Sequence, residues 1–370
     1  MPMFLSSRNG DKSVGSKRSL ELYFDSIGGE NRILRRFEFE IIKIATENFS
    51  ENNKISQWSD GFMYKGRLHN GQGVSIARQE SDSPGQLYKN EVSLLVKLEH
   101  EHLLRLLGYC IEGTQVFLVY DFAISSCLDR VMDDPACTLL DWNKRKKILV
   151  SVARVLMYLH QHDVLHGNVT PSNILLDESL DPKLSEFGLA RYLATNNDDG
   201  TEVHEIYGTP GYIAPEYVTN SCLSTKADVY SFGVVILETI TGCSIRNYVN
   251  SRKENMTFHH YVWRNWLEET SASIIHPRLH VDLSSITRII HIGLLCVQVD
   301  HVDRPTMDKV VGMLTNTLSL ALHMPTVYTT TFSSLMEKYS DNTNASEELL
   351  LTNDYDPTEV DDYILELCPR

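Results

Sequence analysis

The stretch HGNVTPSN at residues 166–173 gathers polar side chains that could take part in chemistry, and EFG follows it at 186–188. Asn173 and Glu186 carry oxygen atoms of the kind that bind Mg²⁺. Asn168 is close to an aspartate in shape, but an amide cannot take up a proton as a carboxylate does. Residues of these types could bind a metal ion, but Asn168 could not act as a general base.

Regular elements must position these residues. Apolar residues recur at helical spacing from 148 to 159, which predicts an amphipathic helix that leads into 166–173. The residues on its apolar face are Ile148, Val152, Val155, Leu156 and Leu159. Earlier in the chain, the sequence predicts strands at 73–78 and 115–120 and a helix around 89–92.

Five motifs in one order resemble those of protein kinases. HGNVTPSN resembles the catalytic loop HRDLxxxN, and EFG resembles DFG. GTPGYIAPE at 208–216 resembles the end of an activation segment, DVYSFG at 228–233 resembles the start of the long buried helix, and Arg304 resembles the arginine that pairs with Glu216. The resemblance implies an α+β, bilobal fold, with a small lobe of five strands and one main helix and a larger, mostly helical lobe.

Within the kinases, the chain is similar to the plant receptor-like kinases, and among them to the cysteine-rich type. FEIIKIATENFS at 39–50, LLGYC at 106–110 and LLDWNKR at 139–145 carry this resemblance. Members usually have an extracellular cysteine-rich region and one membrane span before the kinase domain. We expect here a cytoplasmic form without them.

The resemblance and the charge distribution divide the chain into four parts. We expect a basic, disordered segment at 1–36, a small lobe at 37–120, a large lobe at 121–325 and an acidic, disordered tail at 326–370. Residues 341–370 contain nine Asp or Glu residues and one Arg. The acidic residues of the tail are interpreted as a solvated, non-binding stretch or, alternatively, as part of a docking segment around 360–367.

The nucleotide-binding positions implied by the resemblance are altered. Ser56, Trp58 and Gly61 occupy the three glycine positions of the loop that covers the phosphates, and Ala77 replaces the phosphate-binding lysine. Arg78 cannot substitute, because neighbouring strand residues point to opposite faces. Glu91, the usual partner of that lysine, is expected to be solvated, swung outward or paired with another cation. The remaining positions of the pocket are Met63, Ser75, Tyr120 and Leu175.

The catalytic positions are altered as well. Asn168 stands at the base, and loss of a general base costs about 10²- to 10⁴-fold in rate. Thr170 replaces a lysine that would neutralise the transferred phosphoryl group, a loss of roughly 10²- to 10³-fold. Glu186 replaces the metal-binding aspartate, and a misplacement of about 1 Å can cost on the order of 10²-fold. Mg²⁺ and ATP are therefore expected to bind weakly, through Asn173 and Glu186 if at all.

The activation segment and the internal supports of the fold can also be placed by the resemblance. Thr201, Tyr207 and Thr209 are candidate phosphorylation sites, but Gly167 lacks the guanidinium that would pair with a phosphate there. The segment ends in the APE residues Ala214, Pro215 and Glu216. The structural positions are Leu95, Leu106, His166, Phe187, Asp228 and Arg304.

Composition narrows the choices further. The chain has 370 residues, a net charge of −15 and seven cysteines without a C-x-x-C pair, which favours reduced thiols. It has no long apolar run and no basic stripe, so neither a transmembrane helix nor nucleic-acid binding is expected. Any membrane association is expected to occur through partners.

Three hypotheses follow. The first is a receptor-like cytoplasmic pseudokinase that regulates or scaffolds other receptor-like kinases or their substrates through protein contacts. The second is a weakly active, Mg²⁺-dependent serine/threonine kinase. The third is an adaptor that acts through its acidic tail.

Overall fold

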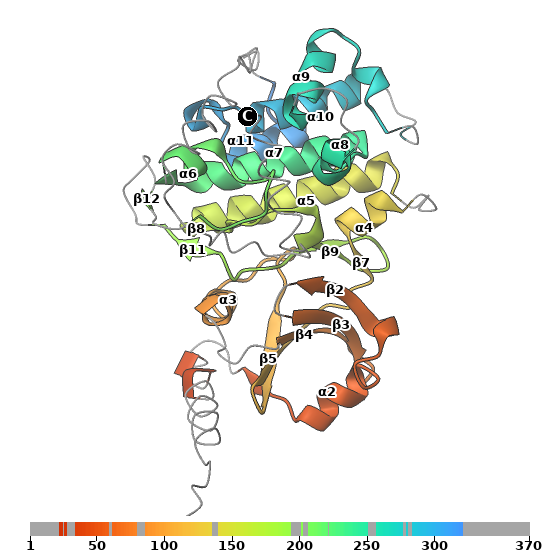
Figure 1. Ribbon diagram of the computed structural model, residues 1–370, viewed down its shortest axis with the longest axis vertical. Coiled ribbons are helices and arrows are strands. Elements are labelled where there is room, and N and C mark those ends of the chain that lie inside the picture. Colours follow the sequence, from red (N-terminus) through yellow and green to blue (C-terminus); the bar gives the residue numbers. More distant parts are fainter. Residues whose placement is uncertain are drawn as a thin grey trace, which may run out of the picture. The chain divides into compact units, whose positions relative to one another are not determined.

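A computed structural model describes residues 22–24, 26–27, 34–58, 61–79, 86–134, 140–193, 201–202, 206–220, 222–250, 257–276, 279 and 283–320 (Figure 1). The chain divides into two compact units. The first comprises residues 1–99 and 103–125, and the second comprises 100–102 and 126–370. The predicted acidic tail at 326–370 lies outside the described residues.

The first unit is built on a six-stranded sheet in the order β1-β5-β6-β4-β3-β2. The strands are β1 Arg35–Arg36, β2 Lys54–Trp58, β3 Gly61–Arg67, β4 Gly73–Gln79, β5 Leu106–Glu112 and β6 Gln115–Tyr120. All neighbours are antiparallel except β1, which runs parallel to β5. Five strands were predicted, and β1 is the sixth.

Disorder was predicted for 1–36, and it does not hold for the few of these residues that the structure describes. Arg35–Arg36 forms a strand, and Phe24 is buried. Sequence periodicity could not show this, because the burial comes from contacts with β5 far along the chain rather than from any local pattern.

Two helices pack against this sheet, and Figure 1 shows α2 (Phe39–Ala45) below it and α3 (Gln86–Leu95) beside β5. Helix α2 packs against one face, where Ile42 joins a core with Ile76 of β4 and Phe117 of β6. Helix α3 lies on the other face, where its Glu91 bonds Tyr120. Because side chains alternate along a strand, β4 presents Val74 and Ile76 to α2 and its odd-numbered residues to the opposite face.

The second unit is mostly helical. Helix α5 (Trp142–Gln161) has the predicted apolar face, and its five predicted residues are all buried. The other helices described in this unit are α4 Leu128–Asp133, α6 Pro215–Asn220, α7 Thr225–Thr241, α8 Ile245–Asn250, α9 Phe258–Leu267, α10 Leu283–Cys296 and α11 Met307–Leu314. The described part of this unit also has short strands. A three-stranded sheet contains β10 Pro182–Leu184, β9 Ile174–Leu176 and β7 Ser126–Cys127, in this order. Two strand pairs are β8 Val164–Leu165 with β11 Arg191–Tyr192 and β12 Thr201–Glu202 with β13 Cys222–Leu223.

Helix α7 is the central element of this unit. Its residues from Ala227 to Thr241 are buried, as the resemblance implied for the segment that begins at Asp228. It approaches α10 so closely that a Cβ atom on Gly233 would lie 2.6 Å from the Cβ of Cys296. The expected α+β architecture, with one unit built on a β-sheet and the other mostly helical, is therefore confirmed.

Among the described residues, the helices include none with the length and apolar character to cross a membrane. The five cysteines described, Cys110, Cys127, Cys222, Cys243 and Cys296, are present as thiols.

Candidate active site

The loop after β8 is fixed by a carboxylate from α7. Asp228 accepts hydrogen bonds of 2.8 Å from the backbone N–H groups of His166 and Gly167, and one of 2.9 Å from His160 Nε2. Burial alone would raise the pKa of the Asp228 carboxyl, but the hydrogen bond and charge of His160 outweigh it and hold this pKa below its usual range. Asp228 is thus an ionised anchor for the loop.

His166 is a packing residue, as predicted. Its Nδ1 faces the N–H of Asn168 at 3.2 Å and its Nε2 faces the Ser185 carbonyl at 2.8 Å, so the proton sits on Nε2. Burial lowers the pKa of the ring, which keeps it neutral. The ring meets Phe187 edge-on, with centroids 4.8 Å apart. In the first unit, the other two predicted packing residues, Leu95 and Leu106, are also buried.

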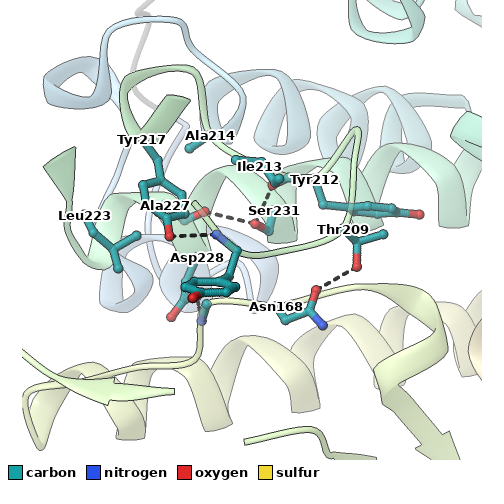
Figure 2. Close-up of a pocket in the computed structure, with 12 residues that line it drawn as sticks. Asn168, Thr209, Tyr212, Ile213, Ala214, Tyr217, Leu223, Ala227, Asp228 and Ser231 are labelled. Carbon is teal, nitrogen blue, oxygen red and sulfur yellow. Dashed lines mark hydrogen bonds between the residues drawn. The ribbon is translucent and has the colours of Figure 1, made fainter. Parts of the chain in front are cut away.

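Asn168 lies where a proton acceptor is needed, but its acceptor atom is already engaged. The side chain is 4% exposed, and its amide oxygen accepts a hydrogen bond of 2.8 Å from the Thr209 hydroxyl (Figure 2). An amide has a single oxygen acceptor and does not become protonated near neutral pH. This position can therefore orient a hydroxyl group but cannot remove its proton.

Asn173 and Thr170 are buried beside Asn168. The Asn173 amide nitrogen donates to the Asn168 carbonyl at 2.9 Å, which leaves the amide oxygen as its potential metal ligand. Thr170 Oγ1 lies 2.9 Å from Ser172 Oγ. A short hydroxyl at 170 supplies no positive charge, in contrast to the lysine that the resemblance implied.

Glu186 is a poor metal ligand in this setting. The side chain is half-buried, and its loss of hydration raises the pKa of the carboxyl to about 7, so a proton competes with a cation near neutral pH. Its backbone has a φ of 66°, in the left-handed region that Asp and Asn adopt more readily than longer residues. Among the described residues, no three His, Cys, Asp or Glu side chains are grouped to hold a metal ion. The residues thus fit a resident Mg²⁺ weakly.

Gly167 has a conformation that suits glycine. Its φ is 79°, and a Cβ atom there would lie 3.2 Å from the Leu189 carbonyl oxygen. The absence of a side chain at 167 therefore fits the local backbone. It also removes the cation that could have paired with a phosphorylated activation segment.

A cavity of about 10 Å³ lies between the loop and the activation segment (Figure 2). This is close to the volume that one water molecule needs. Gly167, Asp228, Tyr207 and Tyr217 are among its lining residues, and the Tyr217 hydroxyl accepts from the Tyr207 N–H at 3.0 Å. The segment around 207–209 is thus joined to its surroundings by protein hydrogen bonds. The side chain of Thr201, the third candidate phosphorylation site, lies outside the described part of the chain.

The end of the activation segment has the predicted ion pair. Arg304 donates to both oxygens of Glu216, at 2.7 and 2.6 Å, and both side chains are buried. Arg304 also donates to the Gln298 and Lys226 carbonyls. Ala214 is buried, and Pro215 begins α6. The framework of this segment is intact although the catalytic positions are changed.

Sequence reasoning missed Glu238 in α7. It is fully buried, and it accepts hydrogen bonds from the Tyr212 hydroxyl at 2.7 Å and from the Ile245 N–H at 2.6 Å. Burial raises the pKa of its carboxyl to about 8. A single acid within the apolar run VVILETI was the signal that could have found it. It joins the activation segment and α8 to the central helix.

In the first unit, Ala77 sits in an apolar row. It is 3% exposed, and it pairs directly with Met63 on β3 and Leu118 on β6, so the three side chains share one face of the sheet. Arg78 points to the other face, where its guanidinium lies 5.0 Å from the centroid of the Phe49 ring. The prediction that Arg78 does not replace the missing lysine is confirmed.

Glu91 has a partner that was not predicted. It is 8% exposed, and its carboxylate accepts a hydrogen bond of 2.9 Å from the Tyr120 hydroxyl. Burial in this contact does not fit the expected solvation or outward rotation, and pairing with another cation stays a prediction. The adjacent Ser75 is buried and donates to the Phe122 carbonyl.

The remaining nucleotide positions are only partly described. Ser56 is half-buried on β2, Gly61 is buried opposite Trp58 in the strand pair, and Leu175 is buried on β9. The side chain of Trp58 lies outside the described residues. The role of Trp58 at a glycine position of the phosphate-covering loop therefore stays a prediction.

Comparison with known proteins identifies the class. The chain belongs to the protein kinase family, because the family model described as protein kinase domain matches residues 61–314.

Its relatives include receptor kinases of Arabidopsis thaliana. It is 41% identical over 333 residues to cysteine-rich receptor-like protein kinase 38, covering 88% of this chain and 50% of that protein. With cysteine-rich receptor-like protein kinase 28 the identity is 42% over 346 residues, 90% of this chain and 49% of that protein. With G-type lectin S-receptor-like serine/threonine-protein kinase SD1-13 it is 40% over 289 residues, 76% of this chain and 34% of that protein. The chain spans about half the length of the first of these relatives.

Proposed function

We propose that the chain is a regulatory member of the receptor-like kinases, with phosphotransfer lost or very weak. It would act on the cytoplasmic side by contacting other receptor-like kinases or their substrates. In this role the kinase fold serves as a rigid binding surface rather than as a catalyst.

The observation that carries the proposal is the state of Asn168. The residue that should accept the substrate proton is an amide whose oxygen already accepts from Thr209. Loss of the base alone costs about 10²- to 10⁴-fold. Starting from about 1–100 s⁻¹ for a competent kinase, turnover would fall to between roughly 1 s⁻¹ and 10⁻⁴ s⁻¹ before any other loss is counted.

The first unit supports the same conclusion. Ala77 offers a methyl group to the phosphates, and Glu91 is bonded to Tyr120 instead of to a lysine on β4. Without that lysine, β4 offers no ammonium group to attract a polyphosphate on this face. Weak nucleotide affinity is the expected consequence.

A preserved framework is what a binding function requires. The Glu216–Arg304 pair and the three hydrogen bonds to Asp228 hold the activation segment and the loop in fixed positions. A surface of fixed shape loses less conformational entropy on binding, which favours association.

A weakly active serine/threonine kinase is the second candidate. The Asn173 amide keeps its hydrogen bond to the loop, and Glu186 keeps a carboxylate, so two oxygen ligands remain. Relatives with about 40% identity are also named as kinases. Saturable binding of ATP that requires Mg²⁺ would favour this candidate. The third hypothesis, an adaptor tail, concerns residues outside the described part.

The regulatory claim can be tested by titrating the purified chain into the autophosphorylation reaction of an active cysteine-rich receptor-like kinase domain. We expect either a change of at least about twofold in the rate of that kinase, or transfer of label to this chain. The matched control is the chain incubated with ATP alone, which should take up no label. If neither the rate nor the labelling of the chain changes at saturating concentrations, the regulatory role is contradicted for this partner class.

A further inference from the structure

The residues that precede the sheet are packed onto it at two places on β5. Phe24 is 1% exposed, and its ring stacks on Tyr109 with the centroids 4.4 Å apart. Arg35–Arg36 pairs in parallel with Gly108 and Tyr109, and the Phe37 N–H then donates to the Tyr109 carbonyl at 2.8 Å. Tyr109 therefore receives both contacts, one through its ring and one through its backbone.

Gly108 makes the second contact possible. A Cβ atom at this position would lie 1.8 Å from the Arg35 carbonyl oxygen, far inside any allowed contact. The seat for β1 exists because β5 has no side chain there. The pairing of β1 with β5 therefore depends on the glycine at 108 as well as on residues 35–36.

The same segment reaches α3. The Tyr23 hydroxyl donates a hydrogen bond of 2.8 Å to the Lys89 carbonyl, and the Lys89 ammonium lies 5.6 Å from the centroid of the Tyr23 ring. Glu91 follows two residues later in α3 and bonds Tyr120 of β6. Helix α3 is thus held from the N-terminal segment at Lys89 and from the sheet at Glu91.

The aromatic stack also lies at one end of the row that contains the altered lysine position. Tyr109 pairs with Leu118, and Leu118 pairs with Ala77. With strands about 4.8 Å apart, Tyr109 is about 10 Å from Ala77 on the same face. A displacement of the Phe24–Tyr109 stack can therefore be transmitted to Ala77 through the Leu118 side chain between them.

We infer that residues 22–24 and 34–37 form an intramolecular strap that fixes α3 and β5, and through them the Glu91–Tyr120 contact. Binding or modification that lifts Phe24 off Tyr109 and Tyr23 off Lys89 releases α3. The position of α3 can then be regulated through this N-terminal segment, independently of the activation segment.

Hydrogen–deuterium exchange on the full chain tests this inference. Phe24→Ala should raise the exchange rates of α3 (86–95) and β5 (106–112) by at least about tenfold, because it empties the seat on Tyr109. Leu22→Ala is the matched control, since Leu22 is 62% exposed in the same segment and should leave both elements unchanged. Exchange in α7 (225–241) should stay as in the natural chain.

Three results would overturn the strap. They are unchanged exchange in 86–95 after Phe24→Ala, an equal effect from Leu22→Ala, and a parallel rise in α7 that reveals general loosening. If Phe24→Ala does not fold, Tyr23→Phe replaces it, because it removes only the hydroxyl that bonds the Lys89 carbonyl. It should raise exchange in α3 about threefold or more, and no rise there would contradict the inference.

Discussion

At the scale of single residues, the changed positions are stable parts of the fold. Asn168 accepts a hydrogen bond from Thr209, and Ala77 packs in an apolar row of side chains. Gly167 has a left-handed backbone conformation that residues with a side chain rarely adopt. Each substitution is locally satisfied, so reversing one of them need not improve stability.

Gly167 allows a direct test of this view. Gly167→Ala should destabilise the chain by about 1–2 kcal/mol for the left-handed backbone, with an added contribution from its contact with the Leu189 carbonyl. Gly71→Ala is the control, because Gly71 has a φ of 84° and no atom near its Cβ position. Urea unfolding of both variants should show the larger loss for Gly167→Ala. Equal losses would mean that the loop has room for a side chain.

At the scale of elements, the activation segment is held by buried polar contacts to the second unit. Glu216 at the start of α6 pairs with Arg304 before α11, and Tyr212 bonds Glu238 in α7. These contacts join segments that are far apart in the sequence. The described end of the segment, residues 206–217, is therefore held by contacts within the protein.

The buried pair should contribute far more than an exposed pair in the same unit. Glu216→Gln leaves the Arg304 guanidinium buried without its counter-charge, which we expect to cost about 3–5 kcal/mol. Asp181→Asn removes one charge from the exposed Lys147–Asp181 pair and should cost less than about 1 kcal/mol. Thermal or urea unfolding compares the two. A cost below 1 kcal/mol for Glu216→Gln would show that the pair does not support the segment.

The sequence predicted those features that depend on residues close together in the chain. The helix at 148–159 was readable because its apolar residues repeat every turn, and Arg304 and Glu216 were found through motifs with fixed letters. The packing of Phe24 and the Glu91–Tyr120 bond were not, because both depend on partners brought near by the sheet rather than on neighbours in the chain. Local patterns predict elements well, but they do not predict which distant side chain satisfies a buried group.

At the scale of the whole molecule, the raised pKa values of Glu238, which is buried, and Glu186, which is half-buried, make stability depend on pH. Burial raises the pKa of Glu238 from 4.5 to about 8, so the folded chain binds a proton that the unfolded chain has released in this range. Stability from this group is therefore complete below pH 4.5 and is lost as pH rises toward 8. Glu186 acts in the same direction up to about pH 7.

Glu238→Gln should flatten this dependence. Between pH 5 and 8 the natural chain should lose on the order of 1 kcal/mol per pH unit through Glu238, while the variant lacks this contribution. Urea unfolding at pH 6 and pH 8 gives the difference for each protein. An identical pH dependence in the two proteins would show that Glu238 is ionised throughout this range.

The central claim is that the substituted positions abolish phosphotransfer while the fold remains. The most direct measurement is transfer of radiolabel from ATP by the purified chain beside a variant with Ala77→Lys, Asn168→Asp, Thr170→Lys and Glu186→Asp. We predict no transfer above background by the natural chain and measurable transfer by the restored variant. Clear Mg²⁺-dependent transfer by the natural chain, on a scale of about 1 s⁻¹ or faster, would contradict the account and require another base and another cation.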